Sequence, residues 1–197
     1  MADLWGRTSV GPTAARAGVV ALALLIGGCS ATGSTSPEKR QTSSGSTAGP
    51  GSDSSSSVSA VEVARSQASA AYVGMWQGVA EAAKTSDWKS PKLARYATGE
   101  ALSVISRSMY ADHRNGLVTK GAPKNYPKVI SAEPPDSPTR VMVSDCGDST
   151  NWLKYRKDTG ELADDTLGGR RAITAEVKKD AGGWKVARFA VEAVGTC

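Results

Sequence analysis

The chain has 197 residues, of which 24 are Lys or Arg and 19 are Asp or Glu, and its net charge is +5 with histidine neutral. The two signs are interspersed, and no run of five or six basic residues marks a nucleic-acid-binding tail. This pattern is typical of a solvated protein surface, so we expect no nucleic-acid partner.

One apolar run, residues 17–26, ends at Gly27-Gly28-Cys29 and follows Arg7 and Arg16. Its length of roughly ten residues suits the core of a secretory signal and is too short for a membrane span, which needs about 20. The small residues before Cys29 resemble the lipobox of bacterial lipoproteins. The resemblance implies a signal peptide over residues 1–28; an ordinary signal peptide with an incidental cysteine is the alternative.

In lipoproteins the cysteine that follows the signal carries a diacylglyceryl group. Two acyl chains give stable membrane attachment, at about 0.8 kcal/mol for each buried methylene. The resemblance therefore implies that Cys29 anchors the chain to the cell membrane, on its extracytoplasmic face. Cleavage would leave 22 basic and 18 acidic residues, a net charge of +4.

Residues 29–57 are expected to form a tether between the anchor and a folded domain. Of the 28 residues that follow Cys29, 11 are Ser, 4 are Thr and 4 are Gly, and none is aromatic. Such a segment has nothing to bury in a core and behaves as a coil with a span of about 30 Å. Residues 58–197 then form a single domain of ordinary size.

The remaining cysteines are Cys146 and Cys197. If Cys29 is acylated and the domain lies outside the cytoplasm, these two thiols are free to be oxidised to a disulfide, which we expect. Two free buried thiols are the alternative. A catalytic thiol is disfavoured because the single histidine, His113, is distant in sequence from both cysteines.

Apolar spacings of three and four predict two helices in the first half of the domain. The first covers about residues 58–86, with Trp76 at the edge of its apolar stripe. The second begins at Ser90, a good N-cap, followed by Pro91 in the first helical position, and stops at Asn115-Gly116.

The second half of the domain is predicted to consist of β-strands. The last two strands are predicted to form a hairpin through Asp180-Ala181-Gly182-Gly183. Two helices followed by antiparallel strands is an α+β pattern. The predicted strands cover residues 128–132, 139–146, 151–156, 171–178 and 184–191.

The helix pair and the final hairpin with Gly183-Trp184 resemble the NTF2-like (SnoaL-like) superfamily. Asp145-Cys146 together with the terminal Cys197 also resembles small secreted or lipid-anchored proteins of actinobacteria. The first resemblance implies two N-terminal helices packed on a curved, cone-shaped antiparallel sheet of four to six strands. The chain lacks a clear third helix, so cystatin-like and other helix-on-sheet folds stay open.

Enzymes of that superfamily use acidic residues and histidines in the cone, and no convergent set of such residues is evident here. Asp112-His113 reads as a solvated helix end, because consecutive helical residues point in different directions. Asp145 and Asp148 are expected to make turn hydrogen bonds, and Asp164-Asp165 to lie in a loop. We expect no catalytic residue, no metal ion and no cofactor.

Four tryptophans of the domain are candidates for binding, since tryptophan is enriched at interfaces. Trp76 and Trp184 are assigned to the core. Trp88 and Trp152 have more polar neighbours in sequence and are the candidate binding surface. The expected function is that of a lipid-anchored, non-catalytic binding or accessory module for an envelope protein, a wall component or a small ligand. The alternative is an enzyme or ligand carrier that uses the cone.

Overall fold

The structure is a computed structural model and describes residues 59–163 and 168–197. The predicted signal peptide, Cys29, the tether and Asp164-Asp165 lie outside the described residues. The helices are α1 (Ala60–Ala83), α2 (Pro91–Tyr96) and α3 (Gly99–Arg114). The strands are β1 (Leu117–Lys120), β2 (Lys128–Glu133), β3 (Arg140–Asp148), β4 (Leu153–Arg156), β5 (Arg170–Asp180) and β6 (Gly183–Val191).

Helix α1 follows the predicted apolar stripe. Ser59 caps its start, because the Ser59 hydroxyl accepts a hydrogen bond from the Glu62 backbone N–H at 3.2 Å. Tyr72, Met75 and Val79 are buried along the stripe, and Trp76 is 1% exposed. The expectation that Trp76 lies at the edge of the stripe was wrong, because its ring is in edge contact with aromatic rings from α1, β6 and residue 152.

The second predicted helix is divided in two, so the domain has three helices and not the two expected. Ala97 is extended, and Ala97 and Val186 form a parallel bridge. The Thr98 N–H donates to the Val186 carbonyl oxygen at 2.9 Å. Gly99 then starts α3 with φ of +54°, a conformation that favours glycine. Pairing with β6 thus interrupts a continuous helical pattern.

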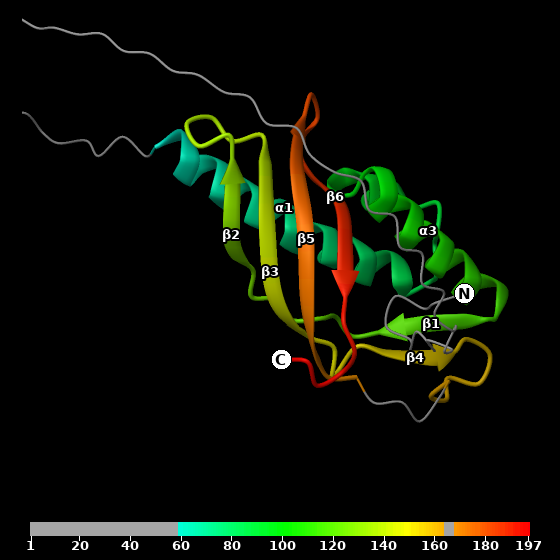
Figure 1. Ribbon diagram of the computed structural model, residues 1–197. Coiled ribbons are helices and arrows are strands. Elements are labelled where there is room, and N and C mark those ends of the chain that lie inside the picture. The colour runs from blue at the N-terminus through cyan, green and yellow to red at the C-terminus, as the bar shows by residue number, and fades with distance from the viewer. Residues whose placement is uncertain (1–58, 164–167) are drawn as a thin grey trace, which may run out of the picture. The chain divides into compact units, whose positions relative to one another are not determined.

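The α+β class is confirmed: the helices precede a four-stranded antiparallel sheet of order β2-β3-β5-β6 (Figure 1). The predicted hairpin between β5 and β6 is present. The sequence suggested that strand β4 joins this sheet, but the structure places β4 outside it. It pairs with β1, a strand that the sequence did not predict, and the two form a separate antiparallel sheet.

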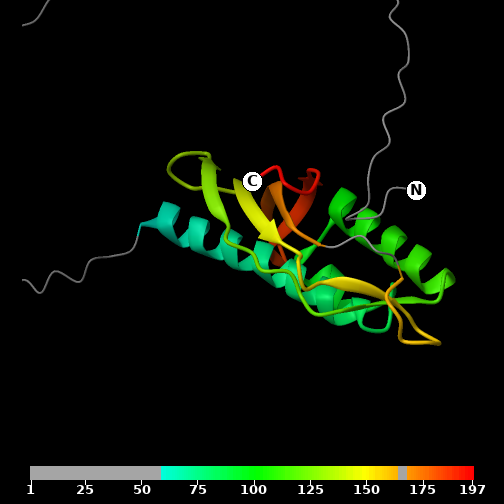
Figure 2. The ribbon, with the colours of Figure 1, turned by 90° about the horizontal axis from the view of Figure 1, so that it is seen from below.

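The core lies between helix α1 and one face of the four-stranded sheet (Figure 2). Trp76 is at its centre, in edge contacts with Tyr72, Trp152 and Phe189 at ring-centre distances of 6.3, 6.1 and 5.4 Å. Such edge-to-face contacts suit the charge distribution of aromatic rings. The sheet residues with 1% exposure or less are Val141, Val143, Ile173, Ala175, Val177 and Val186. Side chains therefore fill the space between α1 and the sheet.

A disulfide joins Cys146 on β3 to Cys197 at the end of the chain, with Cα atoms 5.9 Å apart and a sequence separation of 51. The segment after β6 is also held by hydrogen bonds to β5: the Gly195 N–H donates to the Arg170 carbonyl oxygen, and the Ala172 N–H to the Thr196 hydroxyl. The end of the chain is thus fastened to the central strands. Within the part of the chain described, no helix is both long enough and apolar enough to cross a membrane.

Candidate functional site

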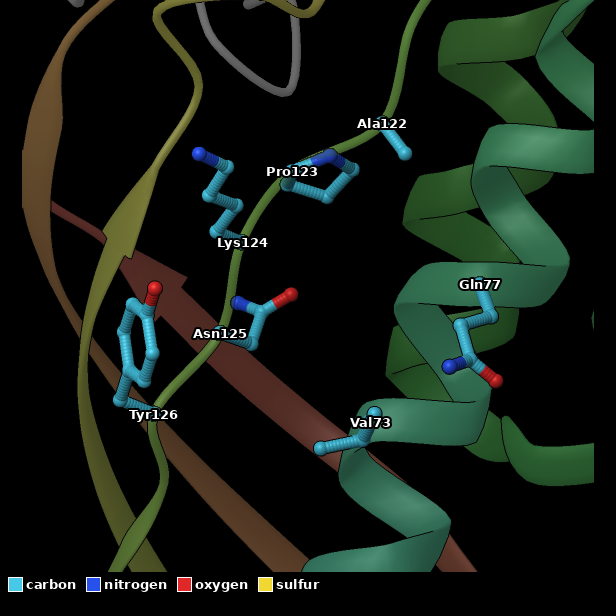
Figure 3. A pocket seen from close by; sticks show the side chains of 7 residues that line it. All are labelled: Val73, Gln77, Ala122, Pro123, Lys124, Asn125 and Tyr126. Atoms are coloured by element: carbon cyan, nitrogen blue, oxygen red, sulfur yellow. The ribbon is translucent and has the colours of Figure 1, made fainter.

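The candidate site is a groove between helix α1 and the connection from β1 to β2. Its volume is about 250 Å³. Val73 and Gln77, four residues apart, lie on the same side of α1 and form one wall. Asn125 extends towards the helix from the opposite wall, whereas Lys124 and Tyr126 extend away from it (Figure 3). The lining residues are Val73, Gln77, Ala122, Pro123, Lys124, Asn125 and Tyr126.

The wall that carries Asn125 is held in place by Asp145, a carboxylate on β3 that is 4% exposed. Its Oδ2 accepts hydrogen bonds from the Tyr72 hydroxyl at 3.0 Å and from Asn125 Nδ2 at 2.7 Å. Its Oδ1 accepts from the Tyr126 backbone N–H at 2.7 Å. Asp145 therefore links the helix, the central sheet and the groove wall, and the three donors compensate for the burial of its charge.

The local sequence explains why the Tyr126 N–H donates to the Asp145 side chain and not to a backbone carbonyl oxygen of β3. Lys128 pairs with Ser144, and Lys124 pairs with Asp148, so the two pairs belong to one antiparallel register. Between them the ladder is interrupted at residues 125–127. Pro127 has no N–H to donate, and the N–H of Tyr126 turns to the Asp145 carboxylate. The interruption frees Asn125 to face the groove.

Burial raises the pKa of the Tyr72 hydroxyl well above its ordinary value of 10, and the nearby charge of Asp145 raises it further. The neutral phenol is therefore favoured in the folded state. Since tyrosine ionises near pH 10 in the unfolded chain, this contribution to stability is complete below pH 10 and declines as the pH rises above it.

We expect Tyr72→Phe to weaken the decline of stability above pH 10 relative to the unsubstituted chain, because phenylalanine has no proton to lose. Urea unfolding at pH 8, 10 and 11 measures the effect. Tyr126→Phe is the matched control, since the Tyr126 side chain is 64% exposed. An alkaline profile of Tyr72→Phe that is identical to that of the unsubstituted chain would contradict the pKa shift.

The prediction for Asp145 was wrong: it makes no turn hydrogen bond and lies in the interior. Strand β3 continues through Asp148, so Asp145 is inside the strand, on the face directed to α1. Asp148 does accept a turn hydrogen bond from the Thr150 N–H at 2.8 Å. The sequence offered one signal for the groove wall, namely Pro123 and Pro127 on either side of Asn125.

Asp112 and His113 are consecutive residues of α3, so their side chains point in different directions. The expectation of a solvated helix end was wrong for Asp112, because its carboxylate is buried and pairs with the Lys154 ammonium at 2.7 Å. His113 is exposed in the last turn of α3, as expected. A histidine suits that position because the carbonyl end of a helix is negative. Among the residues described, no group of three His, Cys, Asp or Glu side chains could hold a metal ion.

The two candidate tryptophans differ in environment. The predicted exposure of Trp152 was wrong: it is 7% exposed and packs against Trp76 in the core. Its polar neighbours in sequence belong to the two-stranded sheet and its turn. Trp88 is half-buried, in edge contact with the exposed Tyr110 at 5.2 Å and with the Lys89 ammonium 4.6 Å from its ring centre. A binding role for Trp88 stays a prediction.

The groove offers the chemistry of binding more readily than that of bond cleavage. Its polar lining includes the side-chain amides of Asn125 and Gln77, and amides both donate and accept hydrogen bonds. Val73, Ala122 and Pro123 add small or apolar surface, and Lys124 and Tyr126 complete the lining. The buried carboxylate behind it is engaged by three donors and holds the wall.

No protein-family model matches the chain, and no curated protein does. Among solved structures, the domain is similar to the intermembrane space region of the chloroplast protein ARC6, with a TM-score of 0.48 and 16% identity, over 66% of this chain and 96% of that one. It is also similar to a protein of unknown function with a cystatin-like fold from Nostoc punctiforme PCC 73102, with a TM-score of 0.40 and 9% identity, over 65% of this chain and 92% of that one.

Proposed function

We propose that the chain is a lipid-anchored cell-envelope protein whose α+β domain is a non-catalytic binding module. The observation that carries the binding role is the position and lining of the groove between α1 and residues 122–126. The alternative, an enzyme or ligand carrier that uses the space between helices and sheet, is not favoured because side chains of the core fill that space. The proposed ligand is an envelope protein, a wall component or a small ligand.

The anchoring half of the proposal predicts that Cys29→Ser releases the chain from membranes. Support comes from the apolar run that ends at Cys29 and from the Ser/Thr/Gly-rich residues that follow it. Loss of the thiol removes the acyl chains that would hold the protein in the bilayer. Fractionation of cells into membrane and aqueous fractions measures the effect, and Ser30→Ala is the matched control. Retention of Cys29→Ser in the membrane fraction would refute the anchor.

The binding half predicts that a photoreactive amino acid at Gln77 captures the ligand in intact cells. Gln77 is exposed and lines the groove, so the reactive group would lie beside a bound molecule. The matched control carries the same group at Ser103, which is exposed on α3 outside the groove. We expect a product at position 77 that is absent at position 103. The same products at both positions would argue against the groove as the binding site.

We further propose that the domain is a variant of the NTF2-like arrangement. Support comes from the helices on one face of an antiparallel sheet and from the third helix, which the sequence alone did not suggest. The separate pairing of β1 with β4 distinguishes this chain from a single continuous sheet. An experimental structure in which β4 joins the four-stranded sheet, or in which the helices lie on both faces, would contradict this assignment.

A further inference from the structure

The two edges of the four-stranded sheet differ in how they are protected. The β6 edge is occupied at Val186, because Ala97 forms a parallel bridge with Val186 and the Thr98 N–H donates to the Val186 carbonyl oxygen before α3 begins. The β2 edge has no strand beside it in residues 59–163 and 168–197. An open edge presents unpaired N–H and C=O groups in a row, which is a template for pairing with another strand.

Apolar side chains are exposed along this open edge. Ile130 is 61% exposed, and Tyr126, which precedes β2, is 64% exposed. The β2–β3 register shifts between Val129 and Ser131, so Ile130 is an extra residue of a bulge, out of the regular alternation. Burial of these two side chains against a partner would remove apolar surface from water.

The β2 sequence, Lys-Val-Ile-Ser-Ala-Glu, is complementary to itself in the antiparallel sense. When two copies pair with Lys128 opposite Glu133 of the other copy, Val129 lies opposite Ala132 and Ile130 opposite Ser131. The register with β3 places Lys128 and Glu133 on the face of the sheet away from α1, and Val129 and Ala132 on the face towards α1. Each face therefore continues across the junction, and opposite charges meet at both ends.

The first turns of α1 reach beyond β2 in both views (Figures 1 and 2). A strand added beside β2 would therefore lie over helix α1. Val63 in this part of the helix is 40% exposed. Helix α1 could therefore pack against a strand added at this edge, as it packs against the strands of the sheet.

We propose that β2 is a homodimer interface, at which two copies of the chain pair edge to edge around a two-fold axis between Ile130 and Ser131. The four-stranded sheets then form one eight-stranded sheet. Pro127 and Pro134 limit the pairing to six residues, so the interface is small and the dimer reversible. In each copy Arg140 contacts Oε2 of Glu133, and Oε1 is the acceptor for Lys128 of the other copy.

A zero-length crosslink between Lys128 and Glu133 tests this pairing. The two residues are at opposite ends of one strand, roughly 16 Å apart at 3.3 Å per residue, so a carbodiimide cannot join them within one chain. Unlabelled and ¹⁵N-labelled copies of the full-length chain are mixed in mild detergent, and the mixture is treated with the carbodiimide. We expect a Lys128–Glu133 crosslinked peptide that contains one light and one heavy half. Its absence would overturn the register.

Charge reversal provides the second test. Lys128→Glu and Glu133→Lys should each lower self-association about tenfold, because each places like charges opposite one another twice in the dimer. A mixture of the two variants restores both attractive pairs and should associate as the unsubstituted chain does. Lys179→Glu, an exposed lysine outside β2, is the matched control. Sedimentation of the full-length chain in detergent measures association.

Glu133→Lys also places a cation beside Arg140, so the thermal midpoint of each variant is measured first. If Glu133→Lys fails to fold, Lys128→Glu against Lys179→Glu decides the matter together with the crosslink. Self-association of Lys128→Glu equal to that of the unsubstituted chain, or a chain that is monomeric at all concentrations, would overturn the proposal. None of these results depends on whether Cys29 is acylated, so failure of the anchor and failure of the dimer are distinguishable.

Discussion

Replacement of both Cys146 and Cys197 by serine is expected to lower the free energy of unfolding by roughly 4 kcal/mol. The disulfide closes a loop across a sequence separation of 51 residues, and a loop of this length costs the unfolded chain that much conformational entropy. It also fastens the end of the chain, since residues 195 and 196 bond to β5 beside it. Loss of the bond should therefore loosen the segment after β6 first.

Thermal and urea unfolding of the double variant measure the loss, and hydrogen exchange in residues 192–197 measures the loosening. A matched control is the unsubstituted chain in reductant, which should reach the same stability as the double variant if the disulfide alone is responsible. Ser144 lies on the same face of β3 as Cys146, so Ser144→Ala measures the loss of stability that a small substitution in that strand causes. A double variant as stable as the unsubstituted chain would contradict the expectation.

The regular parts of the fold were predictable because local periodicity and turn chemistry agree with the tertiary structure there. The apolar stripe of α1 and the hairpin between β5 and β6 depend on residues close in sequence. The break between α2 and α3 depends instead on Val186, which is distant in sequence. Helical spacing continues across Ala97, so the tertiary bridge overrides the local pattern. Thr98-Gly99 was the available local signal for a new helix start.

The candidate site was less predictable, because burial in it is decided by partners far along the chain. Trp152 has polar neighbours in sequence, yet it packs on Trp76 of α1. Asp145 precedes Cys146-Gly147 and looks like the end of a strand, yet β3 continues to Asp148. Neither the length of a strand nor the face that a helix covers is encoded in the few residues around these positions. The groove arises from the same long-range packing.

Asp145→Ala is expected to lower the free energy of unfolding by about 3 to 5 kcal/mol, because it leaves several donors in the interior without their acceptor. The Tyr72 hydroxyl is fully buried, and Asn125 and the Tyr126 N–H lose the carboxylate that orients the groove wall. Residues 122–127 should also become mobile, since Asp145 fills the gap in their ladder. Urea unfolding measures the first effect and hydrogen exchange in residues 122–127 the second.

Two further variants separate the role of this carboxylate from the general cost of a lost aspartate. Asp148→Ala removes an acceptor of a turn hydrogen bond on the same strand, and we expect a much smaller loss because water replaces the carboxylate there. Asp145→Asn keeps the size of the side chain and one acceptor oxygen, but its amide nitrogen faces hydrogen-bond donors. The stability of this variant should therefore fall between those of Asp145→Ala and Asp148→Ala. If Asp145→Ala and Asp148→Ala lose equal stability, the groove wall does not depend on the buried carboxylate. If Asp145→Ala alone abolishes photocrosslinking from Gln77 while the domain stays folded, the wall that Asp145 holds is the part of the groove that the ligand requires.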